Sequence, residues 1–257
     1  MTESFRPDAL AGRRALVTGA SRGIGAAIAT ALATMGAEVV LAADDEPGLC
    51  GIRDAIAAAG GRALVERVDL LDPGAVDRLG AAHDCVDILV NNAAPDQRLM
   101  PALEADERLW RDMFGLNLWT PLALCRRIGL AMIDRRGGCI VNVTSIAARN
   151  PTPLVAPYAC SKAALEILTR VLALELGPHG IRCNAVAPSL VPTQRTRAVF
   201  ENTAFVQAVA AGTPLRRLAT PSDIAGAVAW LASDAAAFVN GQVVTVDGGG
   251  YAASPAT

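Results

Sequence analysis

Three closely spaced glycines stand between an apolar run and a helical pattern near the start of the chain, and this arrangement restricts the fold more than any other feature. The run ALVTG indicates a strand, and the apolar residues of IGAAIATALATM recur at the spacing of one helix face. Between them, TGASRGIG holds Gly19, Gly23 and Gly25. A glycine turn from a strand into a helix lets the backbone approach a pyrophosphate, whose charge the helix N-terminus stabilises. The sequence therefore predicts a dinucleotide-binding loop.

Short apolar runs alternate with helical patterns along the rest of the chain. Further strands are expected at EVVLAA, ALVERVDL, VDILVNNAA, CIVNVTS, IRCNAVAP and QVVTVDGG. Helices are expected over 47–61, 73–83, about 105–135, about 157–177, near 199–210 and over 222–233, the last with Ser222 as its N-cap. This order predicts an α/β fold, a doubly wound parallel sheet of about seven strands with helices on both faces. Since no break in composition divides the chain, one Rossmann-fold domain over 1–257 is expected.

Composition and charge exclude several other classes of protein. Apolar residues make up 52% of the chain and charged residues 19%, which is enough for a large core, and the net charge of −2 gives no footprint for nucleic acid. We find no signal-peptide core and no apolar run of membrane-spanning length. The six cysteines form no CxxC pair, and the two histidines have no neighbours at ligand spacing. We therefore expect a cytoplasmic protein with reduced, mostly buried thiols, no metal site and no membrane partner.

The stretch YACSK places Tyr158 and Lys162 four residues apart, on one face of an expected helix. A free tyrosine has a pKa of about 10, which is too high for a general base at neutral pH. A neighbouring lysine cation favours the phenolate and lowers that pKa. The pair can therefore give or take a proton near neutral pH, although the same spacing also occurs by chance on helix surfaces.

Six motifs stand in a fixed order along the chain: TGASRGIG, NNAA, VNVTS, YACSK, NAVAPS and VDGG. With them the chain, from about Arg13 to Gly250, resembles the short-chain dehydrogenase/reductase family. The resemblance implies direct hydride transfer between a carbinol carbon and the nicotinamide of NAD or NADP. It implies four catalytic residues, which are Asn117, Ser145, Tyr158 and Lys162.

The resemblance also implies a role for each catalytic side chain. Ser145, at the end of CIVNVTS, would hydrogen-bond the substrate oxygen; its alternative role is a cap, which Thr144 could equally provide. Asn117 would bend its helix around a bound water that links Lys162 to solvent. Lys162 would tune Tyr158 and hold the nicotinamide ribose.

The cofactor site implied by the resemblance draws on several strand ends. Asp69 and Leu70 would frame the adenine, and Asn91 to Ala93 would line the adenosine ribose. The remaining contacts would come from Gly19, Ser21, Arg22, Gly23, Ile24, Gly25, Asp44, Pro188, Val191 and Thr193, together with Tyr158 and Lys162. Two positions depart from the family pattern, since Ala94 and Ser189 stand where it usually has glycine.

Charge at the end of the second strand bears on the choice between NAD and NADP. The aspartate that usually selects NAD falls on Ala43, but Asp44 and Asp45 follow it. Two acids there disfavour a 2′-phosphate. Arg22 resembles a phosphate-binding residue of NADP enzymes, and it could instead be solvated or paired with Asp44. NAD is favoured.

The stretch from 189 to 218 resembles the family's variable substrate loop. It contains Gln194, Arg195, Arg197, Phe200 and Phe205, and Arg98 and Arg149 are expected near the pocket mouth. Such arginines would suit a carboxylate or a phosphopantetheine-linked substrate, but solvated loop charges are the simpler interpretation. The substrate is therefore expected to be a secondary alcohol or ketone of unspecified identity.

Two long apolar helices, which contain Trp110 to Met132 and Leu165 to Leu176, resemble the family's dimer helices. A homotetramer built as a dimer of dimers is expected, with ordinary core packing as the alternative. Two other functions stay open. One is a 3-oxoacyl-(acyl-carrier-protein) reductase using NADPH, against which Asp44 counts. The other is a nucleotide sensor without turnover, against which the four catalytic residues count.

Overall fold

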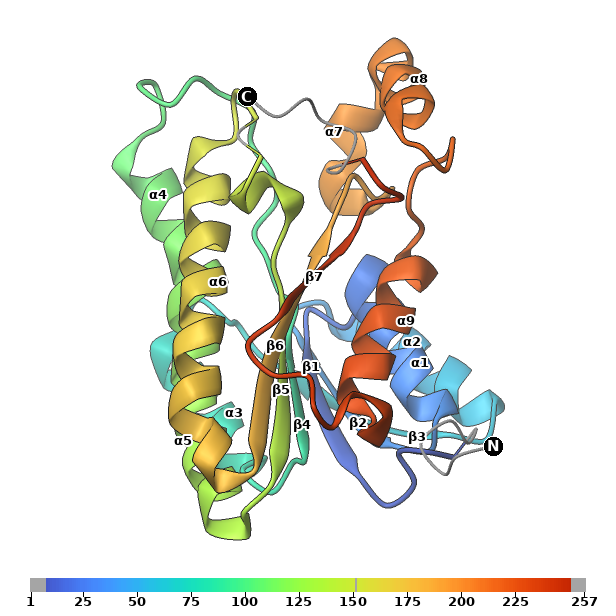
Figure 1. Ribbon diagram of the computed structural model, residues 1–257, viewed down its shortest axis with the longest axis vertical. Helices are drawn as coiled ribbons and strands as arrows, with labels where there is room; N and C mark the ends of the chain where they lie inside the picture. Colours follow the sequence, from blue (N-terminus) through green and yellow to red (C-terminus); the bar gives the residue numbers. More distant parts are fainter. Residues whose placement is uncertain (1–7, 151, 251–257) are drawn as a thin grey trace.

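The computed structural model describes residues 8–150 and 152–250. Its strands form one parallel sheet in the order β3-β2-β1-β4-β5-β6-β7 (Figure 1). The strands are β1 (Arg14–Thr18), β2 (Glu38–Ala43), β3 (Arg62–Arg67), β4 (Ile88–Asn91), β5 (Gly138–Val143), β6 (Ile181–Pro188) and β7 (Val243–Val246). The predicted seven-stranded, doubly wound sheet is confirmed, and its topological switch point lies between β1 and β4.

Helices cover both faces of the sheet. The helices are α1 (Gly23–Thr34), α2 (Glu46–Ala58), α3 (Pro73–Ala82), α4 (Glu107–Phe114), α5 (Thr120–Arg135), α6 (Ala156–Leu176), α7 (Arg197–Phe200), α8 (Thr203–Gly212) and α9 (Pro221–Ala232). Figure 1 shows α1, α2 and α9 on one side and α3, α5 and α6 on the other. The helices α7 and α8 stand at the end of the molecule to which the strands point.

Neighbouring residues of the central strands belong to opposite cores. Leu16 packs in the cluster under α3, α5 and α6, whereas Val17 packs in the cluster under α1, α2 and α9. Val40 and Leu41 of β2 divide in the same way. Because both faces are covered, the runs 15–17 of β1 and 39–43 of β2 are apolar at consecutive positions instead of alternating. The edge strand β3 is partly exposed along its length.

The long helical stretch expected over 105–135 is divided. A π-helical turn, η2 (Gly115–Trp119), separates α4 from α5, and Asn117 lies at its centre. The segment expected near 199–210 is also two helices, because Asn202 ends α7 and caps α8 by accepting from the backbone N–H of Phe205.

The expected N-cap of α9 is wrong. The cap is Thr220, whose hydroxyl accepts from the backbone N–H of Asp223 while the Asp223 carboxylate accepts from the backbone N–H of Thr220. Pro221 fits the first helical position, where no backbone donor is required. This reciprocal capping box places Ser222 inside the first turn.

The six cysteines divide into three buried, one half-buried (Cys50) and two exposed. Cys125, Cys139 and Cys183 are buried, and burial raises the pKa of the Cys125 thiol to about 12. Cys85 and Cys160 are exposed, so the expectation of buried thiols is wrong for these two, which lie outside the packed faces of the sheet. Within the described residues no helix is both long and apolar enough to cross a membrane.

Candidate active site

A cavity of about 1130 Å³ opens at the carboxyl ends of the strands. Such a volume exceeds that of a typical small-ligand pocket and has room for a dinucleotide beside a small substrate. It is lined by most of the residues predicted from sequence: Gly19, Ser21, Arg22, Gly23, Ile24, Gly25, Asp44, Asp69, Leu70, Ala93, Ser145, Tyr158, Lys162, Pro188, Val191 and Thr193. Asn91 and Asn117 are buried behind this lining.

The glycine loop lies directly against the end of β4. Gly19 has a φ of 65°, and a Cβ there would lie 2.9 Å from the Cα of Ala93. A Cβ on Gly25 would overlap the carbonyl oxygen of Gly19, which belongs to the backbone and has nowhere to move. Thr18 supports the contact from below, since its hydroxyl accepts from the backbone N–H of Asn92 at 3.0 Å. Glycine is therefore required by the shape of the loop itself.

The N-terminus of α1 is open toward an anion. The helix begins at Gly23, its cap residue Arg22 supplies no side-chain acceptor, and its first turn contains no acid. The first N–H groups of a helix need acceptors, and a phosphate is one that also suits the helix dipole. This cradle therefore fits the pyrophosphate of NAD or NADP.

The two acids after β2 differ in role. Asp44 is exposed and lines the cavity, whereas Asp45 caps α2 by accepting from the backbone N–H of Gly48 at 3.1 Å. Of the two acids expected to disfavour a 2′-phosphate, Asp44 is therefore the one in the cavity lining, because the start of α2 uses the carboxylate of Asp45. Arg22 is exposed at the same end of the cavity, and no ion pair joins it to Asp44 in the described part of the chain.

Asn91 points into the sheet instead of the cavity. Its Nδ2 donates to Oδ1 of Asn142 at 2.8 Å, and Asn142 donates in turn to Thr169 on α6. From the expected range 91–93, Asn92 and Ala93 line the cavity. The alternation of side chains along a strand accounts for the difference, since Asn91 is still the last residue of β4.

Tyr158 and Lys162 lie together on the buried face of α6. Lys162 is 2% exposed, and its Nζ donates to the carbonyl oxygen of Val143 at 2.8 Å and lies 5.9 Å from the centroid of the Tyr158 ring. Burial and, to a smaller extent, the cation of Arg195 lower the pKa of Lys162 to about 7. The expected lysine cation beside the phenol therefore persists only at neutral pH and below in this state.

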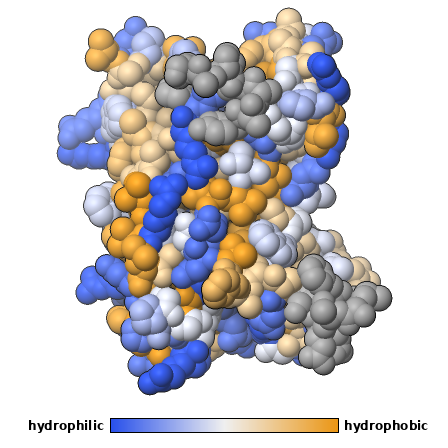
Figure 2. Space-filling model, viewed as in Figure 1, coloured by the Kyte–Doolittle hydropathy of each residue, from blue (hydrophilic) through white to orange (hydrophobic). Residues whose placement is uncertain are grey.

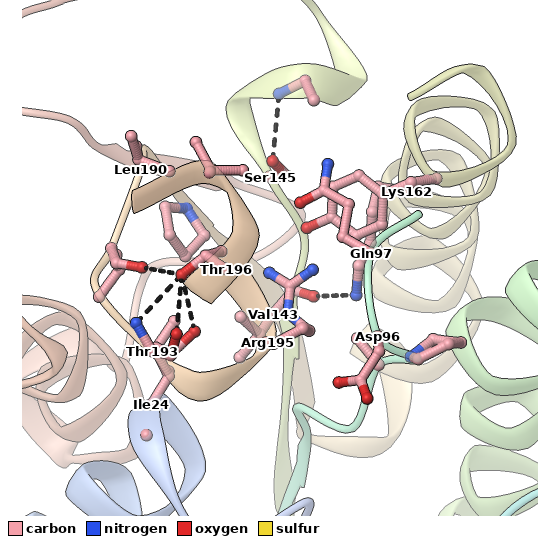
Figure 3. A pocket seen from close by; sticks show the side chains of 18 of the residues that line it. Ile24, Asp96, Gln97, Val143, Ser145, Lys162, Leu190, Thr193, Arg195 and Thr196 are labelled. Atoms are coloured by element: carbon pink, nitrogen blue, oxygen red, sulfur yellow. Dashed lines mark hydrogen bonds between the residues drawn. The ribbon is translucent and has the colours of Figure 1, made fainter. Parts of the chain in front are cut away.

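Ser145 lies just after the carboxyl end of β5 and is the N-cap of the short turn η3 (Ile146–Ala148). Its Oγ accepts from the backbone N–H of Ala147 at 3.2 Å, which leaves the hydroxyl proton free to be donated (Figure 3). Thr144, by contrast, is buried and donates to the carbonyl of Val186 at 3.2 Å. Both residues lie at the end of β5. The hydroxyl of Thr144 bonds to the neighbouring strand β6, whereas the hydroxyl of Ser145 can donate to a ligand.

Asn117 is fully buried in the π-helical turn. Its Nδ2 donates to Oγ of Ser161 at 2.9 Å, and Ser161 donates to the backbone carbonyl of Tyr158. Its Oδ1 has no partner among the described residues. A buried acceptor without a donor is costly, and π-helical turns recur at functional sites. Oδ1 of Asn117 is therefore suited to accept a hydrogen bond from a buried water.

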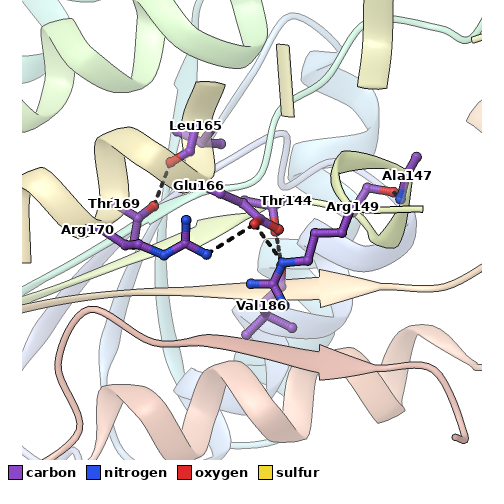
Figure 4. A network of polar contacts seen from close by, with 9 residues as sticks. Thr144, Ala147, Arg149, Leu165, Glu166, Thr169, Arg170 and Val186 are labelled. Atoms are coloured by element: carbon purple, nitrogen blue, oxygen red, sulfur yellow. Dashed lines mark hydrogen bonds and ion pairs between the residues drawn. The ribbon is translucent and has the colours of Figure 1, made fainter. Parts of the chain in front are cut away.

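A buried carboxylate links the turn that carries Ser145 to the helix that carries Tyr158. Glu166, one turn after Lys162, is 3% exposed and accepts from Nε of Arg149 at 2.8 Å (Figure 4). Arg170 approaches the same carboxylate at 3.5 Å. Sequence reasoning missed this network and expected Arg149 at the pocket mouth, which is wrong because its guanidinium pairs with Glu166. No local sequence signal joins two residues so far apart in the chain.

Of the four arginines expected near the substrate, one lines the cavity. The cavity walls include Arg195 but none of Arg98, Arg149 and Arg197. Cζ of Arg195 lies 5.1 Å from the centroid of the Tyr158 ring, close to the reacting group. Ala94 and Ser189, the two departures from the glycine pattern, also line the cavity.

Comparison with known proteins gives matches along nearly the whole chain. A family model described as enoyl-(acyl carrier protein) reductase matches residues 19–251. Gluconate 5-dehydrogenase of Gluconobacter oxydans is 37% identical over 244 residues, 93% of this chain and 95% of that protein. Cis-4-hydroxycyclohexanecarboxylate dehydrogenase of Sinomonas cyclohexanicum is 41% identical over 248 residues, 94% of this chain and 98% of that protein. The 3-oxoacyl-(acyl-carrier-protein) reductase of Escherichia coli is 37% identical over 244 residues, 93% and 98% of the two chains.

Solved structures are similar over the same extent. One from Beutenbergia cavernae, described as an NAD(P)-dependent gluconate 5-dehydrogenase with NADP bound at low occupancy, has a TM-score of 0.93 and 39% identity, covering 96% of this chain and all 100% of that one. A gluconate 5-dehydrogenase from Burkholderia cenocepacia in complex with NADP and tartrate has a TM-score of 0.91 and 32% identity, covering 97% and 98%.

Proposed function

The chain belongs to the short-chain dehydrogenase/reductase family, whose members act on hydroxyl and keto groups with NAD(P), and we propose that Tyr158 is its general acid and base on a secondary alcohol or ketone. The observation that carries the proposal is the position of Tyr158. It lies with Lys162 on one helix face in the cavity wall, and Ser145 lines the same cavity. We also propose that residues 1–257 act as one oxidoreductase domain with its substrate loop at 189–218.

The chain's own residues account for the proton transfers. When bound, NAD or NADP accepts or supplies the hydride. Tyr158 takes the proton of the substrate hydroxyl during oxidation and returns it during reduction. Ser145 donates a hydrogen bond to the same oxygen and stabilises its developing negative charge. Lys162 favours the phenolate when protonated. A water through which Lys162 exchanges protons with solvent is supported by Oδ1 of Asn117, which has no partner in the described part of the chain.

We propose a preference for NAD over NADP. Asp44 supports it, since an exposed carboxylate beside the adenosine ribose accepts from a 2′-hydroxyl and repels a 2′-phosphate. Two observations make the expected preference modest. Asp45 is engaged as a helix cap, and Arg22 lines the same end of the cavity. The two solved relatives described above hold NADP.

A panel of alcohols assayed with both cofactors tests the function. The panel contains gluconate, cis-4-hydroxycyclohexanecarboxylate, cyclohexanol and a 3-hydroxyacyl thioester, and absorbance of the reduced nicotinamide is followed. We expect turnover of at least one alcohol, faster with NAD than with NADP. Binding of cofactor without any turnover would instead support a nucleotide sensor.

A 3-oxoacyl-(acyl-carrier-protein) reductase is the second candidate. It is supported by the relative of Escherichia coli that carries this name and by the description of the matching family model. This function requires that an oxoacyl thioester with NADPH be reduced faster than any free keto compound is. The thioester arm of the same panel, run in the reducing direction, separates the two functions.

We propose that the enzyme is a cytoplasmic homotetramer assembled through α5 and α6. Large apolar side chains on this flank are exposed, with Trp119 at 59%, Leu130 at 59% and Leu174 at 79% exposure. Figure 2 shows hydrophobic residues on the flank that α6 forms. Covering such side chains is the ordinary role of a subunit interface. Light scattering is expected to give four times the chain mass of 26.5 kDa, and Leu174→Glu is expected to reduce it; a wild-type monomer would refute the assembly.

A further inference from the structure

Arg195 brings a guanidinium into the part of the cavity where chemistry is proposed. It belongs to the short turn η5 (Gln194–Thr196), which follows β6. Figure 3 shows its guanidinium directed toward Lys162 and the carbonyl of Val143. Its Cζ is 5.1 Å from the centre of the Tyr158 ring, and its Nη1 is buried with no hydrogen-bond partner among the residues that the structure describes. A buried donor of this kind needs an acceptor.

Three other arginines have carboxylate partners, unlike Arg195. Arg14 pairs with Glu38 at 2.7 Å, Arg149 with Glu166 at 2.8 Å, and Arg217 with Asp223 at 2.7 Å. In the described ranges no ion pair is formed by Arg195, and the cation near it is Lys162, whose pKa it lowers. Two cations without a carboxylate between them attract an anion into this part of the cavity.

We infer that Arg195 binds a carboxylate of the substrate, and therefore that the substrate is a small hydroxy carboxylate or the matching keto carboxylate. The inference rests on the proposed function and names the substrate class of the same site. A guanidinium presents paired N–H donors that match a carboxylate, and such charged hydrogen bonds are strong where water is excluded. Because Arg195 lies against the Tyr158 ring, the carboxylate and the carbinol carbon must be only a few bonds apart. A neutral thioester could offer Nη1 only an uncharged carbonyl acceptor, and a hydrogen bond to it is weaker than one to a carboxylate.

Two measurements test the inference, one with turnover and one without. In the first, each hydroxy acid of the panel is compared with its methyl ester by kcat/KM. In the second, calorimetry measures binding of cyclohexanecarboxylate and of the uncharged cyclohexanecarboxamide to the enzyme in the presence of NAD. The variants are Arg195→Met, which keeps bulk and removes charge, and Arg197→Met as a control, since Arg197 is exposed and outside the cavity lining.

The wild type is expected to prefer acid over ester and carboxylate over carboxamide. Arg195→Met is expected to reduce both preferences by about 30-fold, the loss typical of a charged hydrogen bond. Arg197→Met is expected to change them by less than about threefold, as for a solvated surface charge. Equal melting temperatures of the variants would establish that the fold is retained.

The possible failures are distinguishable. If neutral alcohols turn over and the acid preference is absent, or is unchanged in Arg195→Met, the carboxylate inference is overturned and the proposed function stands. If Arg195→Met mainly weakens NAD binding, the guanidinium belongs to the cofactor, and the inference is likewise overturned. If nothing turns over but carboxylate binding depends on Arg195, the anion site stands and the proposed function fails.

Discussion

The glycine loop and the segment 189–218 meet across one cavity, where a Cβ on Gly23 would lie 3.2 Å from Cγ2 of Thr193. They are built differently. The loop lies closely against the backbone of Ala93, just after β4, and α1 behind it is packed into the core. In the other segment α8 has no buried residue, and Figure 1 shows α7 and α8 standing beyond the sheet. The cofactor end is thus specified by backbone shape, whereas the substrate end is specified by individual side chains such as Arg195.

The largest effect on cofactor affinity should come from adding one methyl group to the loop. Gly25→Ala places a Cβ against the carbonyl oxygen of Gly19, so the turn must open. We expect cofactor affinity to fall at least about 100-fold and the free energy of unfolding to fall by about 2 kcal/mol. Fluorescence titration with the reduced cofactor and denaturant unfolding measure the two losses.

Gly51→Ala is the matched control, because a Cβ at Gly51 on α2 meets nothing within 4 Å. It should raise the free energy of unfolding by about 0.5–1 kcal/mol and leave cofactor affinity unchanged. Equal behaviour of the two variants would contradict the claim that backbone shape specifies this end of the cavity.

This contrast explains what the sequence could predict. The glycine loop, the alternation of strands with helices and the pairing of Tyr158 with Lys162 depend on residues close together in the chain, where periodicity and spacing are informative. The role of Glu166 depends on Arg149 arriving from another element, and the cap role of Asp45 depends on where α2 begins. Among four candidate arginines, only the conformation of the segment after β6 singles out Arg195.

Lys162 belongs to neither the glycine loop nor the segment 189–218. Its burial is expected to lower the free energy of unfolding. Its folded pKa of about 7 lies below the ordinary 10.5, so between these values the unfolded chain holds a proton that the folded chain has lost. Stability therefore rises with pH across this window, and below it the buried cation has its full cost. Lys162→Met should raise the free energy of unfolding by about 3 kcal/mol near pH 6 and by less near pH 9. A variant no more stable than wild type at either pH would show that the lysine is well solvated.

The preference between NAD and NADP tests the role proposed for the side chain of Asp44 at the cofactor end of the cavity. Asp44→Arg should increase the ratio of kcat/KM with NADP to that with NAD by at least about tenfold, because the repelling charge is replaced by an attracting one. Asp45→Asn, which preserves a good helix cap, should leave the ratio within about threefold. A larger shift of the ratio in Asp45→Asn than in Asp44→Arg would mean that Asp45, and not Asp44, determines the cofactor preference.

The smallest effect on the free energy of unfolding concerns the capping box at the start of α9, which follows the segment 189–218. Thr220→Ala removes the capping box of α9 and should lower the free energy of unfolding by about 1 kcal/mol. Ser222→Ala should change it by less than about 0.5 kcal/mol, since Ser222 lies inside the helix. Thermal melts of both variants make the comparison, and the reverse order of stability would restore Ser222 as the cap.

The proposed proton transfer depends most on the phenol of Tyr158. In Tyr158→Phe the ring remains and only the hydroxyl is lost, so one preparation can be assayed for turnover of the best alcohol and titrated with cofactor. We expect turnover to fall about 1000-fold or more while cofactor affinity stays within about twofold, as for loss of a general acid and base. Turnover within about tenfold of wild type would contradict the role of Tyr158 in moving the proton.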